Sequence, residues 1–109
     1  MKYGYVRPVI INDDVIEQKK KISIYTNDIL EETHANNKRR TELDILLNSK
    51  LTDGDILYVT DLCILADSTK HLVDILDYLS KEDISLYVIN LNRYIYKNIQ
   101  GEFLEILHD

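Results

Sequence analysis

The sequence lacks the features that place a protein in a membrane or in an oxidising compartment. Its single cysteine, Cys63, cannot form a disulfide within the chain, which fits a reducing cytosol. No apolar run approaches the roughly 20 residues that a membrane-spanning helix needs. The first residues, Met1–Tyr5, lack the apolar core of a signal peptide. We therefore expect a cytoplasmic protein that does not enter a membrane.

Glycine and clustered metal ligands are also scarce. The three glycines form no glycine-rich phosphate loop, and no pair of nucleophile and base is visible. His34, His71 and His108 have no metal-ligand spacing with one another or with Cys63. The sequence thus predicts no metal site and no cofactor.

Positive charge is in deficit, since the formal net charge is -6. Free binding to nucleic acid draws most of its affinity from contacts of Lys and Arg with phosphates, so an acidic domain is a poor autonomous DNA binder. Basic residues gather at 19–21 and 38–40, but each run is short and is typical of a solvated helix face or a loop. We expect any contact with DNA to be weak.

The order of the apolar segments predicts one α/β domain over residues 1–109. Strands are expected at 2–6, 55–60 and 84–89, with a short edge strand at 29–31, and helices at about 14–25, 40–50 and 67–80. This alternation implies a mostly parallel sheet of four to five strands with helices on both faces. A chain of this length buries roughly two-thirds of its unfolded surface, so it needs no disulfide or metal to fold.

Several finer expectations accompany this pattern. The apolar residues of the first helix that are expected to face the core are Val15, Ile16, Ile22 and Tyr25. Residues 33–39 are polar and predict a loop, and residues 103–107 predict a short helix. The stretch 90–100 is expected to be irregular. Its Tyr94 and Tyr96 alternate as in a strand, which indicates either a partner surface or partial burial against the last strand.

The segment 61–66 joins a predicted strand to a predicted helix, and in α/β domains such loops usually carry the working residues. Here it holds no base, no cationic donor and no nucleophile other than Cys63. A reactive thiol at this place would need a nearby cation or a helix N-terminus. We expect Cys63 instead to be a small buried side chain.

Three segments together resemble the catalytic domain of the resolvase/invertase serine recombinases. They are Gly4-Tyr5-Val6-Arg7, Arg40-Thr41-Glu42-Leu43 and Leu51-Thr52-Asp53-Gly54-Asp55-Ile56-Leu57-Tyr58-Val59. That family opens with a Gly-Tyr-x-Arg-Val-Ser strand and later has an Arg-Pro-x-Leu helix start and a Gly-Asp-x-Leu strand. The resemblance covers about the whole chain in the order of its elements, and it implies the resolvase-like catalytic-domain fold.

The resemblance also implies roles for single positions. The family attacks a DNA phosphate with a serine, and a cluster of arginines neutralises the charge of the transition state. Two of these arginines match Arg7 and Arg40, which would form a residual phosphate-binding pair. The nucleophile position is Val9, and the two loop arginines match Ile64 and Asp67. The resemblance therefore implies that the serine nucleophile and the two loop arginines have been lost, whereas Arg7 and Arg40 remain.

Three of these positions admit a simpler interpretation. Arg7 and Arg40 are each interpreted as pairing with a nearby carboxylate, and the candidates are Asp13, Asp14, Glu32 and Asp61. The serine that ends the family's loop matches Ser68, which we expect to help start the following helix.

These observations predict a catalytically inactive resolvase-like domain, not an enzyme. We expect it to act as a homo-oligomer or on another protein, in a regulatory or assembly role linked to a mobile element. The family's DNA-binding domain is not expected, since the chain ends at Asp109. The alternative is an accessory protein of DNA recombination that binds DNA or phosphate weakly through Arg7 and Arg40.

Overall fold

The five strands form one mixed sheet. The computed structural model describes residues 1–8, 15–32, 41–66 and 68–95. Within them the strands are β1 (Lys2–Val6), β2 (Ile29–Glu31), β3 (Ile56–Val59), β4 (Ser85–Val88) and β5 (Arg93–Ile95). Their order is β2-β1-β3-β4-β5; β1 to β4 run parallel and β5 pairs antiparallel with β4. The predicted fold class is confirmed, with β2 at one edge as expected.

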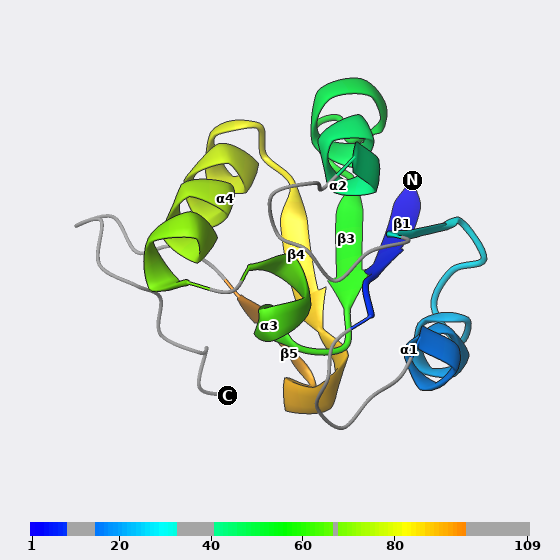
Figure 1. Cartoon of the computed structure of the whole chain (residues 1–109). Coiled ribbons are helices and arrows are strands. Elements are labelled where there is room, and N and C mark those ends of the chain that lie inside the picture. The colour runs from blue at the N-terminus through cyan, green and yellow to red at the C-terminus, as the bar shows by residue number, and fades with distance from the viewer. Residues whose placement is uncertain (9–14, 33–40, 67, 96–109) are drawn as a thin grey trace.

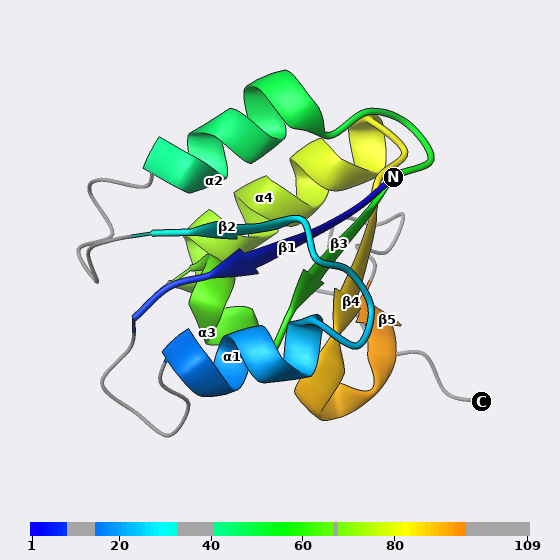
Figure 2. The ribbon, with the colours of Figure 1, turned by 90° about the vertical axis from the view of Figure 1, so that its right-hand side faces the viewer.

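Helices cover both faces of this sheet. They are α1 (Val15–Ile22), α2 (Thr41–Ile45), the π-helix η1 (Leu46–Lys50), α3 (Leu62–Leu65), α4 (Thr69–Lys81) and the 3-10 turn η2 (Ile89–Leu91). Figure 1 shows α3 and α4 on one side of the strands and α1 on the other, and Figure 2 shows α1 in front of the sheet with α4 behind it. No helix within the described ranges is both long and apolar enough to cross a bilayer.

The apolar side chains divide between two cores because neighbouring residues of a strand point to opposite faces. Leu57 and Val59 of β3 belong to the larger core, which α2, α3 and α4 close. Tyr58, which lies between them in sequence, belongs to the smaller core beneath α1, together with Val6 and Ile22. Burial on both faces explains why β3 is apolar throughout rather than alternating.

The first helix is shorter and turned differently than predicted. It ends at Ile22, not near Tyr25, and Ile16 is 65% exposed, so its predicted burial is wrong. Gln18 and Ile22, four positions apart, are fully buried on the inner side, which leaves Ile16 on the outer side. The helix lies so close to β1 that a Cβ on Gly4 would overlap the Ile22 side chain, which is why glycine stands there.

Three further segments differ from or refine the predictions. The segment 61–66, expected to be a loop, contains α3, and β5 lies in the stretch 90–100 that was expected to be irregular. The helix at 40–50 is present from residue 41, but its second half is the π-helix η1. The helix predicted at 67–80 is confirmed as α4, and the Ser68 Oγ accepts from the His71 N–H at 3.2 Å as its cap. The predicted loop at 33–39 and helix at 103–107 lie outside the described residues.

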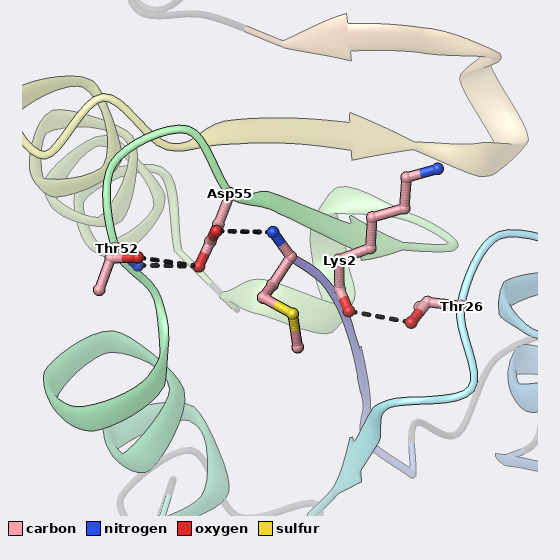
Figure 3. Close-up of polar contacts among 5 residues, drawn as sticks. Lys2, Thr26, Thr52 and Asp55 are labelled. Atoms are coloured by element: carbon pink, nitrogen blue, oxygen red, sulfur yellow. Dashed lines mark hydrogen bonds and ion pairs between the residues drawn. The ribbon is translucent and has the colours of Figure 1, made fainter.

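At the amino edge of the sheet, a buried carboxylate joins β1 to the turn before β3 (Figure 3). Asp55 accepts from the Met1 ammonium at 2.9 Å and from the Thr52 N–H at 3.0 Å. Burial by itself would raise the pKa of Asp55, but the Thr52 hydrogen bonds and the Met1 ammonium together lower it below its ordinary value. Gly54, with φ of 87°, supplies the left-handed conformation that this turn requires.

Candidate functional site

A polar residue follows each of the four parallel strands within two positions. Arg7 follows β1, Glu32 follows β2, Thr60 and Asp61 follow β3, and Asn90 comes two residues after β4. Because parallel strands end at the same edge, these residues lie along the carboxyl edge of the sheet, where α/β domains usually bind ligands. This edge is the candidate site.

The backbone of Arg7 is held by a side-chain amide of α1. The Arg7 N–H donates to the Gln18 Oε1 at 3.1 Å, and the Gln18 Nε2 donates to the Arg7 carbonyl at 2.8 Å. Gln18 thereby pairs with Arg7 as a neighbouring strand would, and it is fully buried. A buried polar side chain needs such partners, and their presence explains a glutamine on the inner face of the helix.

The guanidinium of Arg7 points under α3 and is tied to its backbone. Its Nε donates to the carbonyl of Ile64 at 3.0 Å, and its Nη2 donates to the carbonyl of Cys63 at 2.6 Å. Arg7 as a whole is only 1% exposed. In this structure the guanidinium is therefore not accessible to a phosphate of DNA, since contact requires an accessible N–H.

Asp61, one of the acids considered as partners of Arg7, has other contacts. The Asp61 Oδ2 accepts from the Asn90 Nδ2 at 2.7 Å, and the Asn90 Oδ1 accepts from the Lys21 Nζ at 3.0 Å. The Asn90 N–H also donates to the Thr60 carbonyl at 3.0 Å, which fixes the chain after β4 against the end of β3. Asp13 and Asp14 lie outside the described residues.

Glu32, the remaining acid, connects β1 to the start of α2. Its carboxylate accepts from the Tyr5 hydroxyl at 2.9 Å and from the backbone N–H groups of Glu42 and Leu43, each at 3.2 Å. It is 3% exposed. Backbone N–H groups in the first turn of a helix have no partner within the helix, so a carboxylate stabilises them. Glu32 therefore orients the helix whose start matches the family's Arg-Pro-x-Leu motif.

The other positions singled out from the sequence are placed as follows. Cys63 is exposed, so its predicted burial is wrong: its side chain faces outward from α3 while its carbonyl holds Arg7. Ile64 is buried at 1% exposure and belongs to the larger core. Val9, Arg40 and Asp67 lie outside the described residues.

Neither Gln18 nor Glu32 was assigned its contacts from the sequence. Gln18 stands where a helix of period 3.6 places core residues, and that position was the available signal. The Oγ1 of Thr60 is buried without a hydrogen-bond partner in the described part of the chain. The described ranges contain no group of three or more side chains of His, Cys, Asp or Glu suited to hold a metal ion.

The sheet, its two helical layers and the polar carboxyl edge define an α/β domain with its site at the strand ends. Comparison with protein families identifies a match over residues 2–109 to the family described as Resolvase, N terminal domain. The chain therefore belongs to this family, the catalytic domain of serine recombinases. A comparison with curated proteins finds no match.

Proposed function

We propose that this domain does not cleave DNA and acts in the cytoplasm by binding, either to further copies of itself or to another protein. Its role would be regulatory or in assembly, linked to a mobile element. The proposal rests on the burial of Arg7, whose guanidinium donates to two backbone carbonyls of α3. In a working site that cation would face the phosphate.

The sequence at the remaining catalytic positions supports the same proposal. Val9 stands at the nucleophile position and has no atom that can attack phosphorus. Ile64 and Asp67 stand where the family has loop arginines, so two positive charges are absent and one negative charge is added. Each change weakens the stabilisation of a pentavalent phosphate transition state.

A cleavage assay tests the loss of catalysis. The full chain is incubated with a supercoiled plasmid carrying the DNA that flanks its own gene, and covalent adducts are trapped by denaturation. We expect no adduct and no relaxed product. The variant Val9→Ser, which returns a hydroxyl to the nucleophile position, is expected to remain inactive because Arg7 stays beneath α3. An adduct formed by the natural sequence would overturn the proposal.

Sedimentation equilibrium at micromolar concentration tests the binding role, and we expect self-association. A salt titration of DNA binding tests the alternative of an accessory DNA-binding protein. Binding that falls steeply with salt, and that Arg7→Ala with Arg40→Ala removes, would favour that alternative. The matched control is Lys19→Ala with Lys20→Ala, which removes the same charge from the exposed side of α1.

A further inference from the structure

The helix that precedes β3 ends in a π-turn, which contains one residue more than a turn of α-helix. The Leu51 N–H donates to the Leu46 carbonyl, five positions back, at 2.8 Å. In an α-helix the same N–H would donate to the carbonyl of Leu47, four positions back. Such π-turns are rare, because the hydrogen bonding of an α-helix is interrupted there. The π register of η1 thus takes from the Leu47 carbonyl the donor that an α-helix would give it.

A side chain of α4 supplies that carbonyl with another donor. The Tyr78 hydroxyl donates to the Leu47 carbonyl at 2.6 Å. The Thr52 N–H, which would be the donor if the π-helix continued, donates instead to the Asp55 Oδ2 at 3.0 Å (Figure 3). Tyr78 is half-buried and packs against the larger core. The hydroxyl therefore compensates, in a partly buried place, for the hydrogen bond that the π register costs.

Burial of apolar side chains favours the π register. A hydrogen bond from Leu51 to Leu46 places Leu51 one turn above Leu46, and these residues are 7% and 0% exposed. The α register would place Leu51 above Leu47, which is only half-buried. Core packing thus favours the π register, whereas the hydrogen bonding of the helix itself favours the α register. The donor to the Leu47 carbonyl decides between them.

Both ends of this helix are bonded to buried carboxylates. At its start Glu32 accepts from the N–H groups of Glu42 and Leu43, and beyond its end Asp55 accepts from Thr52. A change of register between two fixed ends must displace one of them by about 1.5 Å, the rise of one helical residue. The register of η1 therefore sets where α2 begins relative to Glu32, at the candidate site.

We propose that the Tyr78 hydroxyl holds residues 46–51 in the π register, and that its loss returns them to the α register. The physical reason is that the π register without this hydroxyl leaves a partly buried carbonyl without its donor, which shifts the equilibrium between the two registers by roughly tenfold toward α. The two registers form a conformational device that couples α4 to the start of α2. This inference goes beyond the proposed function and requires neither self-association nor DNA.

Scalar couplings across hydrogen bonds test this directly, because they identify the acceptor of each N–H in an isotope-labelled chain by nuclear magnetic resonance. In the natural chain we expect the Leu51 nitrogen to couple to the carbonyl carbon of Leu46. In Tyr78→Phe, which keeps the ring and removes only the hydroxyl, we expect coupling to the carbonyl carbon of Leu47. The matched control is Tyr87→Phe, which removes the hydroxyl of another half-buried tyrosine, on the opposite side of the sheet, where it donates to Asn92.

The amide resonances of Glu42 and Leu43 provide a second measurement at the far end of the helix. We expect them to shift in Tyr78→Phe and to stay in place in Tyr87→Phe, because only the former displaces α2 against Glu32. Coupling from Leu51 to Leu46 in Tyr78→Phe, or to neither carbonyl, would overturn the proposal. Coupling to Leu47 in the natural chain would overturn it as well, and unchanged Glu42 and Leu43 resonances would refute the link to the candidate site.

Discussion

Replacing Gln18 by leucine tests the idea that a side-chain amide substitutes for a neighbouring strand at Arg7. Leucine has a similar volume but no polar atom, so the Arg7 N–H and carbonyl lose the partners that they have at 3.1 and 2.8 Å. Each buried group left without a partner costs about 1–3 kcal/mol. The better burial of leucine offsets about 1–2 kcal/mol, and the middle of these ranges leaves a net loss of about 2.5 kcal/mol in the free energy of unfolding.

Urea denaturation followed by far-ultraviolet circular dichroism measures this loss, since the chain has no tryptophan. The matching fall in Tm is roughly 10–20 °C for a domain of this size. The control Lys20→Leu, on the exposed side of the same helix, is expected to change stability by less than about 0.5 kcal/mol. If Gln18→Leu is as stable as Lys20→Leu, the amide does not support Arg7 and the reasoning is refuted.

Three further perturbations follow from single contacts. Because the folded-state pKa of Asp55 is lowered, its charge stabilises the fold above the unfolded-state pKa of about 4, and this contribution is lost as the pH falls through the lower folded-state value. Asp55→Asn should therefore have a lower free energy of unfolding than the natural chain at pH 7, and this difference should disappear in acid. Urea midpoints measured across pH will test this, and a difference that stays constant with pH would contradict it. Gly4→Ala should lower the free energy of unfolding by about 1–3 kcal/mol, because the added methyl group displaces the Ile22 side chain. An unchanged urea midpoint would contradict the close approach of α1 to β1. Exposed Cys63 should react with a thiol reagent in the folded protein about as fast as in urea, whereas strong protection would contradict its exposure.

The elements that the sequence predicted best are those with the clearest periodicity. The strands at 2–6, 29–31 and 84–89 and the helix that Ser68 caps appear nearly where the pattern placed them. The family match over residues 2–109 agrees with the motifs around Arg7 and Gly54. Such features depend on neighbours in the chain, so a short window of sequence contains the information that determines them.

The candidate site was predicted less well because its contacts join distant residues. Two partners of the Arg7 guanidinium are carbonyl oxygens 56 and 57 positions away, and every residue type has such an oxygen. No side-chain identity therefore indicates that Cys63 and Ile64 hold this arginine. The exposure of Cys63 depends likewise on α3, a helix of four residues too short to leave a periodic signal.

The sequence by itself determined the fold class and the family. Only the tertiary structure decided that the Arg7 side chain is buried, that Gln18 pairs with its backbone, and that the Tyr78 hydroxyl bonds to the carbonyl of Leu47. The physical reason is that local propensity and hydrophobic period are properties of consecutive residues. Burial and hydrogen-bond partners, by contrast, arise when the strands pair and the helices pack on them.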